Sequence, residues 1–334
     1  MTLPYAVSMH TVSIWRRWVG LASVAAAVLL ASLVAGPADK GLQDVLLALS
    51  GGADPVARTV ILDLRLPRAL TAFGVGSALA VAGPLPQALF RNPLAAPHVL
   101  GVSGGAAIGA LLAIVLGAGA LGLQAAAATG AIGAIGVVWL LARGHEATRL
   151  LLTGVVVASA CGAVVALLLA VASSEQLRGM VFWLAGDLSN AHEPWPALLA
   201  AALACAFAVL SGRALNVLAA GELRARAVGL DTARWRNAVF VAAAVLTAVA
   251  VVSAGTIGFV GLVAPHLARL LLRTTDHRVL APATALLGGS LVALADLLAR
   301  TVAEPRQLPV GGIMALVGAP VFLLLLMRRT PAAR

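Results

Sequence analysis

Residues 150–174 read LLLTGVVVASACGAVVALLLAVASS, a run of twenty-five residues without a charged side chain. A hydrocarbon core about 30 Å thick is crossed by roughly 20 helical residues, so this run is long enough to span a bilayer once. Seven further uncharged runs occur at residues 18–38, 69–90, 92–142, 194–212, 237–268, 279–295 and 307–327. With 61% hydrophobic and 11% charged residues over 334 positions, the composition does not suit a water-soluble domain. The chain is therefore predicted to be an all-α polytopic membrane protein.

Two of these runs are too long for one crossing. Residues 92–142 have room for two helices with a turn at residues 117–122, and residues 237–268 have room for a tight pair broken at Gly255, Gly258 and Gly261. We therefore expect about ten transmembrane helices in a single domain covering residues 1–334. Residues 18–38 are interpreted as a retained first span, because twenty-one uncharged residues are long for the core of a secretory signal.

Basic residues are concentrated in the loops on one side of the predicted spans. Short cytoplasmic loops retain Lys and Arg, and both ends of the chain are basic, with Arg16 and Arg17 near the start and Arg334 at the end. An even number of crossings with both termini in the cytoplasm satisfies this pattern. The net charge of +10 then reports topology, and nucleic-acid binding is not expected because the basic groups are scattered between spans.

The chain lacks the residues that would let it hydrolyse ATP or catalyse acyl transfer. A P-loop needs a lysine after its glycines, and Lys40 is the only lysine. Residues 101–105, GVSGG, fit the G-x-S-x-G motif of serine hydrolases, but they open an apolar helix after a proline-containing turn. Small residues at Gly101, Gly105 and Gly109 suit close packing of helices in lipid instead. No catalytic residue is predicted.

Ionisable and sulfur-containing side chains are few within the spans. His98, His266, Arg269 and Asp296 lie near span ends or turns, which disfavours an ion-coupled carrier without excluding it. The two cysteines fall inside predicted spans and are interpreted as small apolar residues, so no metal site is predicted.

The longest charged interval, residues 213–236, reads RALNVLAAGELRARAVGLDTARWR. Residues 217–220 and 223–228 mix apolar and basic positions, which predicts two short helices, and Gly229 is placed to end the second. Trp235 and its flanking arginines are suited to anchor the next span at the interface. Because a simple tether needs no apolar residues at helical spacing, this loop is predicted to dock a soluble partner. The alternative is a solvated basic loop.

Several short motifs follow one another in order along the predicted spans. They are LRLPR at residues 64–68, FRNPLAAP at 90–97, LGVSGGA at 100–106, E-x-x-A-R-x-x-G-L at 222–230, GFVGLVAPH at 258–266, DHR at 276–278, AD-x-x-AR at 295–300, LPVG at 308–311 and GAP at 318–320. In this order and spacing the chain resembles, over nearly its whole length, the FecCD/BtuC-type permease subunits of binding-protein-dependent ABC importers for iron-siderophores, haem and vitamin B12.

The resemblance implies a BtuC-like type II ABC importer fold, in which two copies of a ten-helix subunit enclose a path at the two-fold axis. It further implies two ATP-binding cassette ATPase subunits on the cytoplasmic side, which would hold the ATP and Mg, and a periplasmic substrate-binding protein on the outer side. This chain itself would bind no cofactor, and it would lie in the bacterial inner membrane.

The resemblance also assigns roles to individual residues. Arg65, Arg68 and Arg300, all expected on the outer face, would meet acidic residues of the binding protein; the alternative is that they anchor span ends to lipid headgroups. The element that couples the permease to the ATPase would consist of Glu222, Arg224, Ala225, Arg226, Gly229 and Leu230. Its small residues, Ala225 and Gly229, are expected at the closest contact with the ATPase.

Two departures from the family pattern fall near the expected cytoplasmic gate. Pro84 and Pro86 stand where the family more often has other residues, so the second span is expected to bend near its cytoplasmic end. Ala96 stands where the family often has Asp, in the turn that follows Asn92 and Pro93. Pro84, Pro86, Asn92 and Pro93 are therefore the candidate gate residues.

The resemblance favours import of an iron chelate, either haem or a ferric siderophore, with cobalamin as the close alternative. From other classes, an ion-coupled carrier and a structural membrane scaffold stay open. His98 and His192 are interpreted as interfacial hydrogen-bonding groups rather than haem ligands. Asp187, Ser189 and Asn190 are candidates for contact with substrate or the binding protein, and equally for a solvated loop.

Overall fold

The computed structural model describes residues 5–36, 40–143, 147–191 and 193–327, which form helices and turns with no strand among them. The first half contains α1 (Tyr5–Val34), α2 (Leu42–Ser50), α3 (Pro55–Arg58), the π-helical segment η1 (Thr59–Arg65), α4 (Leu66–Ala82), α5 (Pro84–Phe90), the 3-10 turn η2 (Pro97–Leu100), α6 (Val102–Val115), α7 (Ala120–Ala142) and α8 (Ala147–Val171). The second half contains α9 (Ser174–Leu184), α10 (Trp195–Leu210), α11 (Gly212–Ala219), α12 (Glu222–Ala227), α13 (Thr232–Ala254), α14 (Val260–Leu272), α15 (His277–Thr301) and α16 (Val310–Met327).

Ten apolar helical segments are present in the described part of the chain. Six helices are long and apolar enough to cross a membrane alone, whereas α10 and α11 are long and apolar enough only as a pair that bends by 71°, as in a broken span or a re-entrant loop. The shorter apolar helices α6, α14 and α16 complete the set. The predicted breaks also occur, at residues 116–119 between α6 and α7 and at residues 255–259 between α13 and α14. The prediction of an all-α membrane fold is confirmed.

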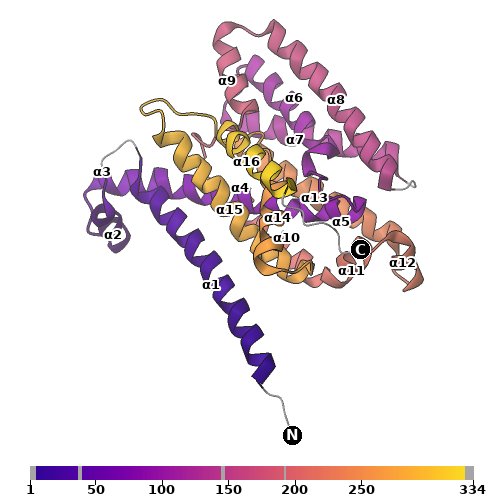
Figure 1. The fold of residues 1–334 in the computed structure, drawn as a ribbon. Coiled ribbons are helices and arrows are strands. Elements are labelled where there is room, and N and C mark those ends of the chain that lie inside the picture. Colours follow the sequence, from indigo (N-terminus) through magenta and orange to yellow (C-terminus); the bar gives the residue numbers. More distant parts are fainter. Residues whose placement is uncertain (1–4, 37–39, 144–146, 192, 328–334) are drawn as a thin grey trace.

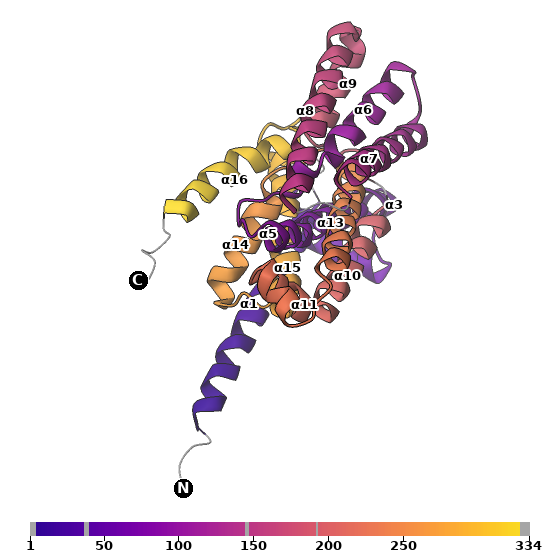
Figure 2. The ribbon, with the colours of Figure 1, turned by 90° about the vertical axis from the view of Figure 1, so that its right-hand side faces the viewer.

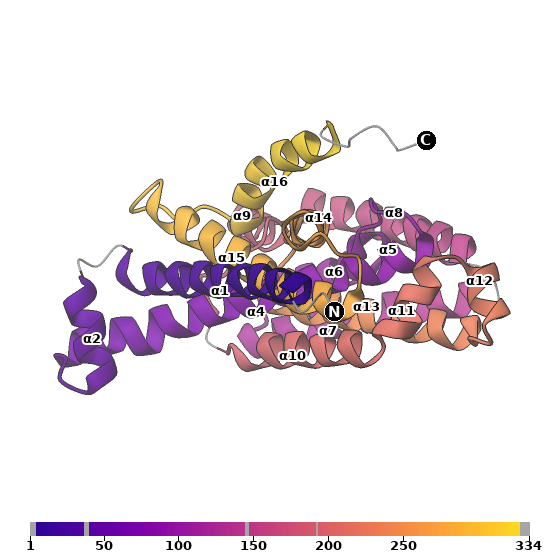
Figure 3. The ribbon, with the colours of Figure 1, turned by 60° about the horizontal axis from the view of Figure 1, so that its bottom comes forward.

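Several helices run between two opposite ends of the molecule (Figure 3). α2 lies at one end and α12 at the other, with α1, α4, α10 and α15 running between them. We call these the α2 end, which the sequence predicts to face outward, and the α12 end, which it predicts to face the cytoplasm. Helices α6 to α9 form a group on one side (Figure 1), whereas the first turns of α1 extend away from the other helices (Figure 2).

α4 lies at the centre of the packing. The span that contains α4 covers residues 55–90, and 89% of the residues in its most apolar stretch are buried. α4 itself contacts α10, α13, α14 and α15. A Cβ atom added to Gly76 would overlap the carbonyl oxygen of Gly288, and one added to Gly288 would overlap the Cβ atom of Ala80. Because lipid tails are as apolar as leucine, helices in a membrane cohere through such close backbone approach rather than through a hydrophobic force.

A second close contact joins α6 to α7. A Cβ atom on Gly105 would overlap the carbonyl oxygen of Gly130, and one on Gly109 would overlap the carbonyl oxygen of Ala126. Gly101 precedes α6 with a φ of +79°, a conformation that favours glycine. The interpretation of this GVSGG segment as a packing motif is thereby confirmed.

Pro84 and Pro86 interrupt the hydrogen bonding of the second span, while the bend expected there stays a prediction. Neither proline has an N–H group to donate, and the N–H of Gly83 bonds to the carbonyl of Ala80, three residues back. Gly83 nevertheless keeps helical dihedral angles (φ −62°, ψ −56°), so α4 and α5 form one continuous apolar stretch. Both prolines are buried among neighbouring helices, which is the setting where a broken helix is tolerated in a membrane.

Gly76→Ala is expected to lower the free energy of unfolding by about 1–3 kcal/mol, because the added methyl group forces α4 away from α15. Gly133→Ala is the matched control, since Gly133 lies in α7 with open space around it and alanine is the better helix former there. Thermal unfolding of both variants in one detergent tests this expectation. Equal midpoints would contradict the packing role of Gly76.

Candidate functional site

The three arginines predicted to dock a binding protein lie in one cluster at the α2 end, around Asp296 of α15. Arg68 donates two hydrogen bonds to Oδ1 of the Asp296 carboxylate, from Nη2 at 2.8 Å and from Nε at 3.0 Å. The Nε atom of Arg300 lies 3.7 Å from Oδ2 of Asp296, one helical turn along α15. Asp296 is only 1% exposed. The cluster therefore holds three positive charges against one negative charge.

Two of these arginines also cap the end of α1. Arg65 donates from Nη1 to the carbonyl oxygens of Leu33 and Val34, at 2.8 Å each, and Arg300 donates from Nη2 to the carbonyl of Ser32. The last carbonyls of a helix have no partner within the helix and carry its partial negative charge. Arg65 and Arg300 thus satisfy buried carbonyls while neutralising the helix end, and they tie α1 to η1 and α15.

Exposure differs among the three arginines. Arg65 and Arg300 are 5% and 4% exposed, whereas the side chain of Arg68 is 12% exposed and its Nη1 atom donates to Gln307 at 3.0 Å. Sequence reasoning found the arginines but missed that Asp296 unites them. The available signal was the four-residue spacing of Asp296 and Arg300, which places both on one helix face.

The predicted coupling loop forms two short helices, α11 and α12, at the α12 end. α12 lies where it was expected, whereas α11 covers residues 212–219 instead of 217–220. Glu222 starts α12 and accepts from Arg226 at 2.7 Å and from Thr232 at 3.2 Å, while Arg236 of α13 lies 3.6 Å away. The hydrogen bond from Arg226 is the main reason that the pKa of Glu222 lies below its ordinary value. Gly229 follows α12 with a φ of +81°, as the prediction of a helix end there requires. The loop is therefore folded and anchored on α13.

Individual residues of this loop point in different directions. The expectation that Ala225 forms the closest contact with the ATPase is wrong, because Ala225 is completely buried within its own chain. The N–H of Leu230 bonds to the carbonyl of Ala225 at 2.9 Å. Arg224 and Gly229 are exposed. The large apolar side chains of Leu223 and Val228 are 85% and 70% exposed. Leu223 and Val228 could not be singled out from the sequence. Which face of α12 stays exposed depends on which face packs against the rest of the chain.

The candidate gate residues lie where α5 turns back into the fold. Asn92 closes this turn: its side-chain oxygen accepts from the N–H of Leu94 at 2.9 Å, and its carbonyl accepts from Ala95 at 3.0 Å. Arg91 precedes it with a φ of +50°. The chain then reaches His98, whose Nδ1 and Nε2 atoms lie 2.9 Å from the Ser103 hydroxyl and 3.0 Å from the Ile257 carbonyl. His98 is thus a hydrogen-bonding group; His192 lies outside the described residues.

Irregular segments from distant parts of the chain also meet where α9 and α13 end and α16 begins. The N–H of Asp187, after α9, bonds to Ala254 at the end of α13, and the N–H of Val310 at the start of α16 bonds to the carbonyl of Gly186, both at 2.9 Å. Ser189 donates its N–H and hydroxyl to the carboxylate of Asp187 at 2.8 and 2.6 Å. These contacts satisfy backbone groups where helices stop, as a membrane interior demands.

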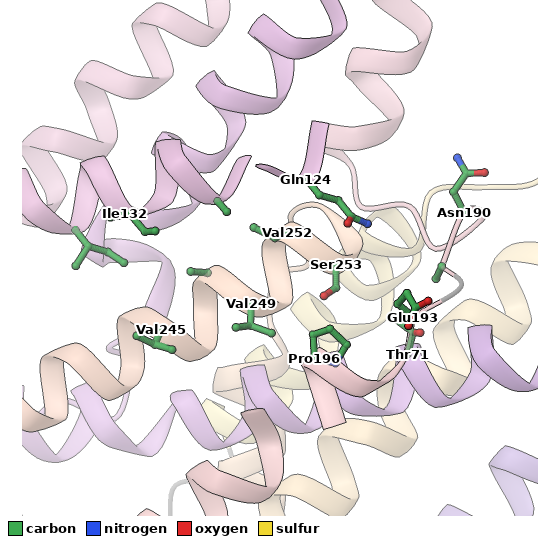
Figure 4. A pocket seen from close by; sticks show the side chains of 14 residues that line it. Thr71, Gln124, Ile132, Asn190, Glu193, Pro196, Val245, Val249, Val252 and Ser253 are labelled. Atoms are coloured by element: carbon green, nitrogen blue, oxygen red, sulfur yellow. The ribbon is translucent and has the colours of Figure 1, made fainter. Parts of the chain in front are cut away.

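An apolar cavity of about 340 Å³ lies between α7, α10 and α13 (Figure 4). Ile132, Val245 and Val249 line one part of it, while Gln124, Asn190 and Glu193 stand at the other. Asn190 therefore borders this cavity, whereas Asp187 and Ser189 bond to each other. Within the described residues no group of three His, Cys, Asp or Glu side chains is arranged to hold a metal ion.

The sequence pattern of the FecCD transport family matches residues 24–328. The chain belongs to the FecCD transport family. Relatives include the vitamin B12 import system permease protein BtuC of Shigella sonnei, 40% identical over 82% of this chain and 85% of the relative. The cobalamin import system permease protein BtuC of Halobacterium salinarum is 43% identical over 84% of this chain and 77% of the relative.

A solved structure described as a metal-chelate type ABC transporter in an inward-facing conformation is 31% identical to this FecCD protein. The two superpose with a TM-score of 0.81 over 94% of this chain and 99% of the other. Sequence and fold agree, and the chain is a permease of the FecCD/BtuC type of ABC importer. The family resemblance stated from the motifs is thereby confirmed.

Asp296→Asn is expected to lower the free energy of unfolding of this FecCD permease by about 3–5 kcal/mol, because it leaves buried arginines without their counter-charge. Asp63→Asn is the matched control, an exposed carboxylate at the same end of the molecule. Thermal unfolding in detergent measures both. An Asp296→Asn variant as stable as Asp63→Asn would show that the cluster does not hold α1, α4 and α15 together.

Proposed function

We propose that this chain is the membrane subunit of an ATP-driven importer that carries a large metal chelate into the cytoplasm, with cobalamin as the first candidate. The observation that supports this most is the match to the FecCD family along nearly the whole chain, joined to relatives whose names assign them to vitamin B12 or cobalamin import. An iron chelate, haem or a ferric siderophore, is the second candidate. It is supported by the neighbouring fold described as a metal-chelate type transporter.

The proposed assembly contains two copies of this chain, two ATP-binding cassette ATPases and a periplasmic binding protein in the bacterial inner membrane. The ATPases supply ATP and Mg, and this chain supplies no cofactor. The α12 end faces the cytoplasm with both termini, since short cytoplasmic loops retain arginine. The whole chain, residues 1–334, acts as one transmembrane domain with residues 213–236 as its coupling loop.

Binding-protein docking is proposed at the arginine cluster of the α2 end. Arg65, Arg68 and Arg300 outnumber Asp296, so a surplus of positive charge lies just below that surface. A buried surplus attracts an acidic lobe through space without direct contact. Arg68, the most exposed of the three, is the one placed to contact a carboxylate itself.

ATPase coupling is proposed at α12 and its C-terminal turn. Leu223 and Val228 supply the apolar contact surface, and Arg224 adds charge beside it. Arg226 and Glu222 hold α12 on α13, and buried Ala225 allows α12 to lie close to its own chain. Gly229 and Leu230 end the helix. Motion of the ATPase is therefore passed to α13 through a fixed element.

The gate is proposed at the turn after α5. Pro84 and Pro86 remove two backbone donors, which leaves α5 less firmly joined to α4 than a regular helix would be. Asn92 and Pro93 form the tight turn that α5 carries with it. A small rotation of α5 would therefore move this turn without disturbing the packed part of α4.

Transport is tested in proteoliposomes that contain this permease with its ATPase and binding protein. ATP-dependent uptake of cyanocobalamin is expected, and none without ATP or without the ATPase. Haem and a ferric siderophore are assayed in parallel. Uptake of one of these without uptake of cyanocobalamin would show that the substrate is an iron chelate. Uptake by the purified permease alone would indicate an ion-coupled carrier, and no uptake with any partner would indicate a scaffold.

Leu223→Asp with Val228→Asp is expected to reduce transport at least about tenfold while ATP hydrolysis continues, because burying a charged side chain in the proposed apolar contact is unfavourable. Both side chains are exposed, so the unfolding temperature should not change. Val56→Asp, an equally exposed valine in α3 at the opposite end, is the control for the substitution itself. Normal coupling in the double variant would place the ATPase contact elsewhere.

A further inference from the structure

A polar cavity of about 500 Å³ lies at the α12 end, apart from the exposed face of α12. Three segments line it: α5 with the turn that follows, α11, and the connection from α14 to α15. Its lining residues are Gln87, Ala88, Arg91, Pro93, Asn216, Ala219, Arg269, Thr274, Thr275, Asp276 and His277. Cavities of about 300–1,000 Å³ commonly receive small organic ligands.

Arg269 is held in this cavity by a fixed partner. Its Nη2 atom donates to the side-chain oxygen of Gln87 at 2.6 Å, and the Gln87 amide nitrogen donates to the carbonyl of Gly261 at 3.1 Å. Gln87 is 5% exposed, so its amide orientation is set by these two bonds. The other donors of the Arg269 guanidinium have no partner among the residues that the structure describes. Arg269 is therefore positioned with hydrogen-bonding capacity to spare.

The charges that face the cavity do not balance. Arg91 and Arg269 line it with one carboxylate, Asp276, and among the described residues neither arginine forms an ion pair with it. The Asp276 carboxylate caps α15 instead, accepting from Asn216 at 2.8 Å and from the N–H of Arg278 at 3.1 Å. Both bonds stabilise its charged form and keep the pKa of Asp276 below its ordinary value. The cavity is thus lined by two guanidinium groups and one carboxylate, and neither guanidinium group is ion-paired with that carboxylate.

We propose that this cavity binds a phosphate group carried on a small polar molecule or on a lipid headgroup, held by Arg269 and Arg91. The planar fork of arginine matches phosphate oxygens with two parallel hydrogen bonds. The hydroxyl of Thr275, exposed on the same wall, adds a further donor. The volume exceeds what a bare phosphate needs, which leaves room for the attached group.

Occupation of this site would join segments that the proposed transport cycle moves. Arg91 belongs to the turn after α5, Asn216 to α11 beside the coupling helix, and Arg269 to α14. A phosphate bridging Arg91 and Arg269 would hold the turn against α14, so the ligand would stabilise one arrangement of the gate. The proposal does not depend on which chelate is transported.

Binding is tested on the purified full-length permease by thermal unfolding. Sodium phosphate is titrated against sodium chloride of equal ionic strength in detergent, which tests a soluble phosphate. In a second arm, nanodiscs of phosphatidylglycerol are compared with nanodiscs of phosphatidylcholine, which tests an anionic lipid headgroup. Saturable stabilisation in either arm is expected, and the arm that responds identifies the source of the phosphate.

Arg269→Gln and Arg91→Gln are each expected to weaken that binding by about tenfold or more, the loss typical of a hydrogen bond to a charged group. Arg273→Gln is the matched control, an exposed arginine four residues after Arg269 that does not line the cavity. Arg91 is exposed in a turn, so its variant remains informative if Arg269→Gln fails to fold. No stabilisation in either arm, or an equal response from all three variants, would overturn the proposal.

Discussion

Backbone groups in a lipid environment must find hydrogen-bond partners inside the protein, and this requirement shapes every part of the fold. Helices meet it within themselves, which is why most of the chain that the structure describes is helical. Helices stop inside the molecule after α9 and between α13 and α14. There, carbonyl and N–H groups without a partner in their own segment bond to another segment: the N–H of Val310 to Gly186, and the N–H of Asp187 to Ala254. At these two places one irregular segment completes the hydrogen bonding of another.

The same requirement explains the arginines at the α2 end. The last carbonyls of α1 are buried and need donors, and arginine supplies several donors together with the positive charge that a helix C-terminus favours. Asp296 then offsets part of the charge brought in by Arg65, Arg68 and Arg300. A structural role and a docking role are compatible here, because the positive surplus left after capping α1 is available to attract an acidic partner.

Features that depend on local composition could be predicted from the sequence, whereas those that depend on distant contacts could not. The ten apolar segments, the breaks near Gly117 and Gly255 and the two helices of the coupling loop all follow from runs of apolar residues and from glycine. The ion pair of Arg68 and Asp296 joins residues 228 positions apart, and no local sequence pattern predicts it. Burial of Ala225 and exposure of Leu223 likewise depend on how α12 lies on the rest of the chain.

The way α12 lies on the start of α13 both fixes α12 in place and leaves Leu223 and Val228 exposed. Glu222 connects α12 to Thr232 and Arg236 at the start of α13, so α12 cannot move without moving that helix end. α13 packs against α4, α5, α6, α7 and α10, which makes it the route from the α12 end into the centre of the molecule. α11 reaches α5 directly, and α5 is joined to α4 by the weakened segment at Pro84 and Pro86. In the coupling proposed at Leu223 and Val228, motion of α12 would reach α13 through Glu222, and it would reach the turn at Asn92 through α11 and α5.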